Sequence, residues 1–289
     1  MPELPEVENV AIALRDSLCT KQLTGIRVRY ARALMPSPTI VRSRLIGRQV
    51  TGVFRHGKYI FIDFEPVESR ISTVRPDALV ADDKARDVVQ LMLHLRMTGQ
   101  VFTSPDYKTD KHLRLIFDFA GQPVFYRDIR KFGGFTLLTK EFGRAAIPHV
   151  GPDMLEISSA EWLNRIHHRR APIKNLLLDQ GIAAGLGNIY ADEALFFARL
   201  NPLSQPANLT QESLRRLYRQ ARRILRLAIK HGGTTFQDFV DFQGKPGNFK
   251  EKLSVYGRTG EKCAKCSGVV QRIKIGGRSA HFCPICQPE

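Results

Sequence analysis

The sequence predicts an α+β protein in three parts: an N-terminal antiparallel β-sandwich that opens with a helix, a helical domain, and a terminal zinc-finger hairpin. Short β-rich runs separated by glycine and polar breaks fill the first half of the chain. Amphipathic helical patterns follow, and two Cys-x-x-Cys pairs stand near the C-terminus. Because 289 residues exceed what one hydrophobic core usually serves, we expect several domains. Their expected bounds are 1–146 for the sandwich, 147–152 for a linker, 153–255 for the helical domain and 256–289 for the finger.

The first element is expected to be an amphipathic helix. Apolar residues recur in steps of three and four residues, at Leu4, Val7, Ala11, Leu14 and Leu18. Pro5 suits a first turn, where its missing N–H leaves no hydrogen bond unmade. The acids of the opening, MPELPEVE, fall at the positive end of the helix dipole, which favours their charge.

Four β-rich runs follow, and no long helical pattern separates them. They read TGIRVRYARAL, QVTGVFRHGKYIFIDF, VQLMLHLRMTGQVF and HLRLIFDFAGQPVFYRDIRKFGGFTLLT. Runs of this kind, bounded by turn residues, are typical of antiparallel strands in a sandwich or barrel. A polar, charge-dense stretch at 66–88 interrupts them, and we expect a surface insertion with little order there.

Helical patterns begin after the Pro- and Gly-containing segment AIPHVGPDML. They read SSAEWLNRIHHRR, PIKNLLLDQ, YADEALFFARL and TQESLRRLYRQARRILRLAIKHG. The last carries seven arginines and lysines. A charge run of this kind is most often a solvated helix face.

The charge balance favours a polyanionic partner. Lysines and arginines number 44 against 28 acids, which gives a formal net charge of +16. Nucleic acid is the commonest partner for such a chain. A membrane surface ranks lower, because no basic helix carries an aromatic anchoring face. No apolar stretch approaches a membrane span and no secretory signal is present, so we expect a cytoplasmic protein.

The cysteines predict a metal site. Their spacing, C-x2-C-x16-C-x2-C, offers two close thiolate pairs to one tetrahedral Zn²⁺: Cys263, Cys266, Cys283 and Cys286. Four thiolates leave no open coordination position, so the zinc would be structural and would stabilise a hairpin too small for its own core. Cys19 stands apart and is expected to be a buried, inert thiol. Zinc ribbons of this spacing also bind proteins, so the finger alone does not indicate an enzyme.

The N-terminus offers catalytic chemistry. If Met1 is removed, Pro2 becomes a free secondary amine, and an α-amino group titrates near pH ~8. Its uncharged form could attack a sugar aldehyde carbon and form an iminium, which acidifies the neighbouring carbon and permits elimination. Glu3, one residue on, could exchange protons with the sugar or hold the amine.

Several motifs together resemble one family. They are PELPEVE, HGKY, HLRMTG, DIRKFGG, IKNLLLDQGIAAGLGNIYADEALF, VYGRTGEKC and the cysteine finger. In this order, over nearly the whole chain, they are similar to bacterial formamidopyrimidine-DNA glycosylases. The resemblance implies a helix–two-turns–helix motif in the helical domain and a monomeric enzyme acting on damaged double-stranded DNA. It also implies excision of oxidised purines, 8-oxoguanine and formamidopyrimidines, followed by β,δ-elimination at the abasic site.

The resemblance also implies the catalytic residues. Pro2 would attack the anomeric carbon of the damaged nucleotide, with Glu3 beside it, and Glu6 would be a second acid that fixes the N-terminus. Lys58 of HGKY would transfer protons during elimination and, as a nearby cation, lower the pKa of the amine. The arginine that corresponds to Arg278 is sometimes assigned as a proton donor in this family. Because a guanidinium titrates above ~12, binding a phosphate is the more suitable role for it.

DNA contacts are implied at further positions. Met97, Arg130 and Phe132 would fill the gap left by an extruded base and bond its orphaned partner. The resemblance implies contacts with phosphates or nearby parts of the DNA at His112, Arg169, Lys174 and Asn188. Glu6 is grouped with these DNA-contacting residues. The family often has a second histidine two residues before the position of His112, where this chain has Asp110. The stretch GKPGNFKEKLSVYGR would belong to the loop that closes over the extruded base.

Two alternative functions are weighed against this interpretation. An endonuclease VIII-like enzyme for oxidised pyrimidines is the nearer one, but that relative typically has glycine where this chain has Leu4. A zinc-finger DNA-binding protein without catalysis would keep the basic charge and the finger. It would have no use for Pro2, Glu3 and Lys58.

Overall fold

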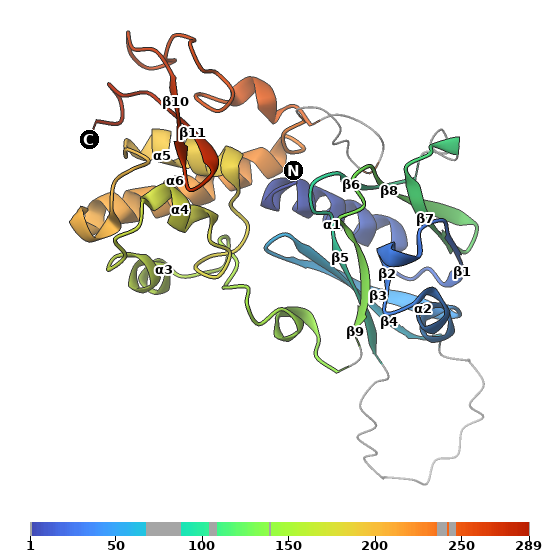
Figure 1. The fold of residues 1–289 in the computed structure, drawn as a ribbon. Helices are drawn as coiled ribbons and strands as arrows, with labels where there is room; N and C mark the ends of the chain where they lie inside the picture. The colour runs from blue at the N-terminus through green and yellow to red at the C-terminus, as the bar shows by residue number, and fades with distance from the viewer. Residues whose placement is uncertain are drawn as a thin grey trace.

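The structure of the chain is a computed structural model that describes residues 2–67, 88–103, 109–138, 140–235, 242 and 247–288. The β-rich domain and the helical domain lie side by side, and the C-terminal hairpin lies against the helical domain (Figure 1). The predicted insertion at 66–88 falls almost wholly outside the described residues. So do the first residues, 244–246, of the stretch expected to close over an extruded base.

Two sheets form the sandwich, as predicted. One has the strand order β2-β9-β5-β4-β3: Leu34–Met35, Gly134–Leu138, Val89–His94, Tyr59–Pro66 and Arg48–His56. The other has the order β1-β7-β8-β6: Leu23–Val28, Leu113–Phe119, Gln122–Asp128 and Gly99–Phe102. The described pairings are antiparallel except that of β2 with β9, which is parallel. The chain between Met35 and Gly134 joins these two strands, and a connection of this length permits a parallel pair.

Helix α1 spans Leu4–Leu18, the predicted range. Its residues Val7, Val10, Leu14 and Leu18 are buried in the core between the sheets, whereas Leu4 belongs to the core of the helical domain. The helix therefore fastens the two domains together. Cys19 comes just after its end and is half-buried, and burial raises the pKa of its thiol.

The remaining helices are α2 (Pro38–Leu45), α3 (Ser159–Ile166), α4 (Ile173–Leu178), α5 (Asn188–Ala198) and α6 (Gln211–Lys230). Three of these five, α2, α3 and α6, are capped as their sequences suggest. Ser37, Ser158 and Thr210 each accept a hydrogen bond from a backbone N–H of the first turn that follows. Among the described residues, no helix is both long and apolar enough to cross a membrane.

The segment predicted as a linker is packed into the junction. Ile147 and Val150 are buried together with Phe61 of β4 and Ala184 of the helical domain. The amide of Gly151 donates to Gln180, 2.9 Å away, and its carbonyl lies 2.8 Å from the His56 ring. The two domains are thus held in contact at this point as well as through α1.

The C-terminal hairpin consists of β10 (Gln271–Ile275) and β11 (Arg278–Phe282). It packs on α5, where Phe196 and Val255 share a small core with Val270, Cys263 and Cys283. The finger is therefore built onto the helical domain (Figure 1).

Candidate active site

The N-terminus of α5 is capped by a residue far away in sequence. The cap position holds Gly187, which has no side chain to accept the free amides of the first turn. The carboxylate of Glu3 accepts them instead, from Gly187 (2.7 Å), Ile189 (2.9 Å) and Tyr190 (3.3 Å). A Cβ at position 187 would come within 2.4 Å of the Glu3 carboxyl carbon. The charge of Glu3 thus faces the dipole of α5, and not only that of its own helix as the sequence suggested.

Glu6 holds the N-terminal segment from below. It is buried, and its carboxylate accepts hydrogen bonds from the amides of Glu3 (2.8 Å) and Thr234 (2.7 Å) and from the hydroxyl of Tyr190. Burial, with the charge of Glu3 adding to it, raises the pKa of Glu6 to about 7. This arrangement ties the N-terminal segment to Tyr190 and Thr234 of the helical domain. It corrects the grouping of Glu6 with DNA contacts, because its oxygens are turned to protein groups.

Lys58 lies in the turn between β3 and β4 and is buried. Burial lowers the pKa of its ammonium, and the positive charge of Arg278 acts in the same direction, while the charges of Glu3 and Glu6 oppose them. The turn is fixed from the helical domain by Asp153. That carboxylate accepts the Gly57 amide at 2.7 Å and pairs with the Arg55 guanidinium.

Three of the predicted catalytic residues, Glu3, Lys58 and Arg278, line one cavity of about 380 Å³. Its lining comes from both domains and from the finger: Glu3, Lys58, Met97, Leu178, Gln180, Gly187, Asn188, Ile189, Tyr256 and Arg278. Pro2 is buried and directly precedes Glu3. The structure thus brings together an N-terminal segment, a buried lysine and an arginine that are far apart in the sequence.

Met97, Arg130 and Phe132 form an exposed cluster beside this cavity. Read alone, Met97 and Phe132 would be core residues, but they are 40% and 58% exposed. The Arg130 guanidinium lies 2.9 Å from the sulfur of Met97 and 4.7 Å from the ring centroid of Phe132. Large apolar side chains exposed next to a cation suit contact with stacked bases.

Lys174 departs from the prediction of a phosphate contact. Its side chain is fully buried, and its ammonium donates to the Asn188 carbonyl (2.9 Å) and pairs with Asp192. The second oxygen of Asp192 accepts the amide of His281 in β11 at 2.9 Å. In this structure Lys174 therefore links α4, α5 and the finger, since a buried ammonium is stable only when paired.

The other residues predicted to contact DNA differ in how accessible their side chains are. Arg169 is exposed just after α3. Asn188 lines the cavity, and its Oδ1 is buried without a hydrogen-bond partner among the described residues. His112 is half-buried, and its amide donates to Asp110 at 2.6 Å. Asp110, which stands where the family often has histidine, also pairs with Arg127 at 2.7 Å and so has a structural role.

Sequence reasoning missed the residues that position this site. Gln180 fastens the turn before α5 by bonding the carbonyls of Leu178 and Leu186 and the amide of Gly185. Glu193 accepts three consecutive amides ending at Tyr256, each at 2.9 Å. Asp192 and Glu193 are acids inside the otherwise apolar run IYADEALFF. Because buried acids need hydrogen-bond or charge partners, two acids in an apolar run could have indicated that these residues hold other segments in place.

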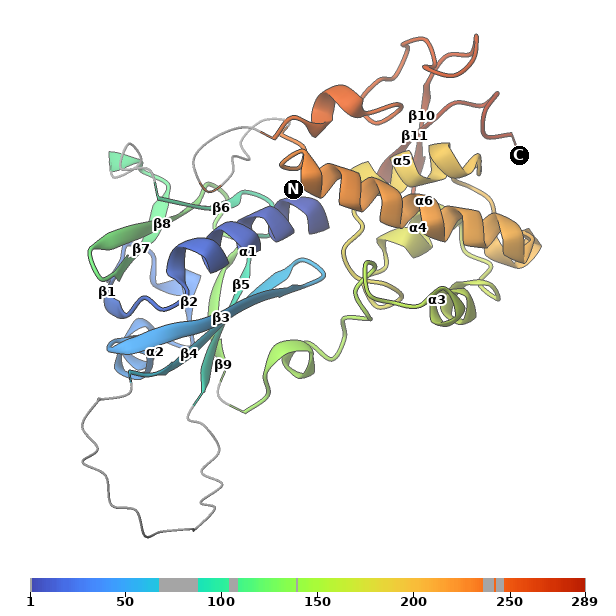
Figure 2. The same ribbon diagram turned by 180° about the vertical axis from the view of Figure 1, so that it is seen from behind.

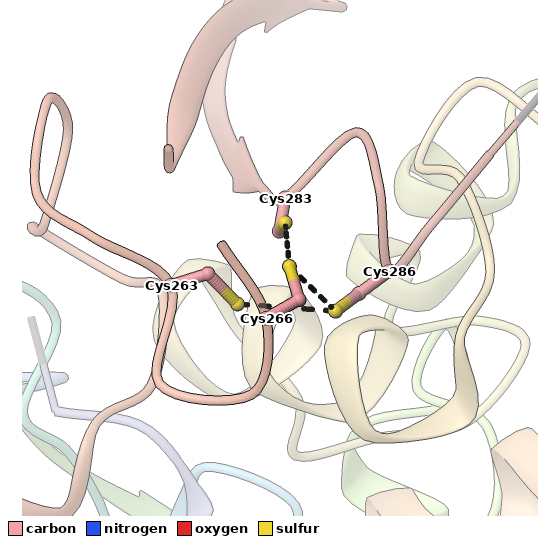
Figure 3. Close-up of side chains that lie close together, drawn as sticks. All are labelled: Cys263, Cys266, Cys283 and Cys286. Atoms are coloured by element: carbon pink, nitrogen blue, oxygen red, sulfur yellow. Dashed lines mark hydrogen bonds between the residues drawn. The ribbon is translucent and has the colours of Figure 1, made fainter. Parts of the chain in front are cut away.

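The four predicted zinc ligands converge (Figure 3). Their sulfurs all lie within 4.8 Å of one another, and three of the separations are 3.5, 3.5 and 3.8 Å. Zn–S bonds of about 2.3 Å in a tetrahedron place sulfurs about 3.8 Å apart. The amides of Lys265 and Gly268 each point at a ligand sulfur from 3.4 Å. This donor set fits one structural zinc ion.

Family models match along the chain. The formamidopyrimidine-DNA glycosylase N-terminal domain matches residues 1–135, and the formamidopyrimidine-DNA glycosylase H2TH domain matches residues 150–240. A zinc finger found in FPG and IleRS matches residues 260–288.

Relatives match over their full length. A formamidopyrimidine-DNA glycosylase of Heliobacterium modesticaldum is 37% identical over 99% of this chain and 100% of its own, and one of Chloroflexus aurantiacus is 35% identical over 99% and 98%. Solved complexes of Lactococcus lactis Fpg, one with DNA containing an abasic site and one of a mutant with DNA containing Fapy-dG, align over all of both chains. Each has a TM-score of 0.84 and 30% identity. The chain therefore belongs to the formamidopyrimidine-DNA glycosylase family.

Proposed function

We propose that this protein is a monomeric DNA glycosylase that excises oxidised purines from duplex DNA and then cleaves the abasic site. The observation that carries the proposal is the cavity lined by Glu3, Lys58 and Arg278, since Pro2 directly precedes Glu3 in the chain. The relatives support it, because their names and the DNA in the Lactococcus lactis complexes point to the same class of substrate.

The first step assigns the nucleophile to Pro2. Once Met1 is removed, the amine of Pro2 would donate its lone pair to C1′ of the damaged nucleotide, and the bond from C1′ to the base would break with its electrons leaving on the base. Glu3 holds this segment through three amides at the N-terminus of α5, so that the amine is positioned. The C1′–O4′ bond would then break with its electrons leaving on O4′, which takes up the proton lost by the amine, and an iminium would remain between Pro2 and C1′.

The elimination steps assign proton transfer to Lys58. Its lowered pKa makes the neutral amine, which can accept a proton, more available near neutral pH. Loss of a proton from C2′ would break the C3′–O bond, and a second elimination would break the C5′–O bond. Arg278, whose guanidinium stays charged, would hold a phosphate during both.

DNA recognition is assigned to the exposed cluster and to the groups around the cavity. Phe132 and Met97 would fill the gap left by the extruded nucleotide, and Arg130 would bond the orphaned base. Asn188, with its unpartnered oxygen at the cavity, and Arg169 would meet the backbone. Zinc would hold the finger hairpin so that Arg278 reaches the cavity.

Borohydride trapping tests the chemistry. We expect protein that has lost Met1 to become covalently linked to 8-oxoguanine duplex in the presence of borohydride. Protein shown by mass to retain Met1 should not trap, because its proline nitrogen is an amide. Equal trapping by both forms would exclude Pro2 as the nucleophile. Absence of trapping and strand cleavage, with tight binding to damaged duplex, would favour a DNA-binding protein without catalysis.

The same assay separates the two enzyme classes. A duplex carrying an oxidised pyrimidine should trap far more slowly than one carrying 8-oxoguanine. The reverse preference would favour the endonuclease VIII-like alternative.

A further inference from the structure

Helix α6 carries a line of positive charge that the site does not use. Its 20 residues include seven arginines and lysines but one acid, Glu212. Five of these cations are exposed and follow one another at steps of four, four, three and four residues: Arg215, Arg219, Arg223, Arg226 and Lys230. At 3.6 residues per turn, they cover about 80° of the helix and a length of about 22 Å. We refer to these five residues as the α6 stripe.

The α6 stripe faces away from the cavity. The buried side of the helix is opposite to it and consists of Leu214, Leu217, Ala221, Ile224, Leu225 and Ala228. Helix α5 packs against α6 and also against β11, so it lies between the stripe and the hairpin that carries Arg278. In Figure 1 the hairpin lies in front of α5, whereas in Figure 2, seen from behind, α6 lies in front. DNA bound at the cavity therefore cannot also cover the stripe.

Among the described residues, the protein pairs only one member of the stripe with a carboxylate. Solvated helices usually interleave acids with bases, because like charges four residues apart repel one another. Here Glu212 pairs with Arg219 at 2.7 Å. Within the described part of the chain, Arg226 and Lys230 have no carboxylate partner. The helix thus tolerates repulsion that an acid at any of several exposed positions would relieve.

The positive surface continues toward the finger. Arg223 and the exposed Lys265 lie over the same ring, that of Phe197, with their cationic groups 5.3 and 4.3 Å from its centroid. Stacking on an aromatic ring holds these side chains without removing their charge. A row of positive groups of this length is matched better by the regular negative charge of a nucleic-acid backbone than by a single acidic side chain.

We propose that the α6 stripe binds a second segment of DNA duplex through its phosphates, without sequence preference, while the first segment occupies the cavity face. The chemistry that would recognise this segment is a regular polyanion, because the exposed groups of the stripe are cations with no base-reading amides among its five members. The protein would then hold two duplexes at once, and the bond to the second would be sensitive to salt.

A bridging experiment tests this with the full-length zinc-loaded protein. Undamaged duplex is fixed to beads, and capture of a second, fluorescent undamaged duplex is measured with wild-type protein, with Arg219→Glu/Arg226→Glu and with Arg27→Glu/Arg44→Glu. The last pair is exposed on β1 and near the end of α2, so it makes the same change in net charge elsewhere. Because neither duplex is damaged, the result does not depend on excision.

We expect wild-type protein and the control variant to capture the second duplex, and the stripe variant to lose this capture by about tenfold or more. The slope of log affinity against log salt should become shallower by about two for the stripe variant, since two phosphate contacts are removed. Excision of 8-oxoguanine from a short duplex in single turnover should be unchanged in both variants. Melting temperatures confirm that each variant is folded.

Other outcomes would overturn the proposal. If the stripe variant still captured the second duplex, that duplex would bind elsewhere on the protein. If the control variant lost capture to the same extent, the loss would follow from the change in net charge and not from the stripe. Failure of wild-type protein to bridge would exclude a second duplex. If polyglutamate displaced the second duplex at lower charge concentration than competing duplex does, the stripe would favour an acidic protein partner instead.

Discussion

At the scale of single residues, the exposure of Phe132 makes its proposed role separable from folding. A side chain that is 58% exposed contributes little to the core, whereas a ring stacked on a base contributes about 1–3 kcal/mol. We expect Phe132→Ala to slow excision of 8-oxoguanine from duplex by about 10- to 100-fold. Strand cleavage at a preformed abasic site should suffer less, because no base has to be extruded. The measurement is the pair of single-turnover rates beside a thermal melt.

Phe142→Ala is the matched control, since Phe142 is also exposed but lies in the segment after β9. It should leave both rates unchanged. If Phe132→Ala instead lowers both rates in parallel together with the melting temperature, Phe132 packs the protein and does not hold DNA open.

At the scale of elements, the junction of α1 with α5 should make stability depend on pH through Glu6. The folded pKa of about 7 lies above the ordinary value of 4.5. The folded chain therefore binds a proton more readily than the unfolded chain between these values, and the contribution of Glu6 to the free energy of unfolding falls as pH rises from about 4.5 to about 7. Over this window the loss amounts to about 3 kcal/mol.

Glu6→Gln removes the titration. The difference in unfolding free energy, wild type minus variant, should decrease from pH 5 to pH 8 in denaturant titrations. Glu161→Gln, on the exposed surface of α3, controls for the general effect of removing an acid. A pH-independent difference for Glu6→Gln would mean that the carboxylate titrates alike in the folded and unfolded chain.

At the scale of the whole molecule, zinc should matter more for DNA binding than for the sandwich. The ligands are confined to 263–286, and metal binding in such fingers provides about 10–16 kcal/mol that the apo hairpin lacks. We expect chelation or Cys266→Ser to release the hairpin, withdraw Arg278 from the cavity and abolish tight binding to damaged duplex. Strand signals in circular dichroism should persist.

The single tryptophan reports how far this loss spreads, because Trp162 is buried in the core of the helical domain. Its emission should change little, and added zinc should restore binding to the chelated wild type but not to Cys266→Ser. Undiminished binding by metal-free protein would contradict the assignment.

Local patterns predicted the elements better than the contacts between them. The spacing of apolar residues gave the limits of α1, and the cysteine spacing gave the metal centre. The bonds of Glu3 join positions 184 to 187 residues apart, so nothing near Glu3 in sequence could indicate them. The sequence offered Lys174 as a phosphate contact, but the packing of α4 on α5 places Asp192 beside it. The resemblance named residues that line one cavity, but only the folded chain shows which charges point inward.

Because α1 contributes side chains to two cores, it limits which domains can be exchanged between this protein and its relatives. Leu4 fills the helical domain so closely that it leaves no room for a Cβ at Gly185, and Glu3 does the same at Gly187. A chimera that joined residues 1–146 to the helical domain of a distant relative would carry this first turn into a foreign surface, where a bulkier residue at either glycine position would block it. Recombination would have to transfer the first turn and the start of α5 together. Although three modules can be recognised along the chain, the first two share contacts that would have to be exchanged together.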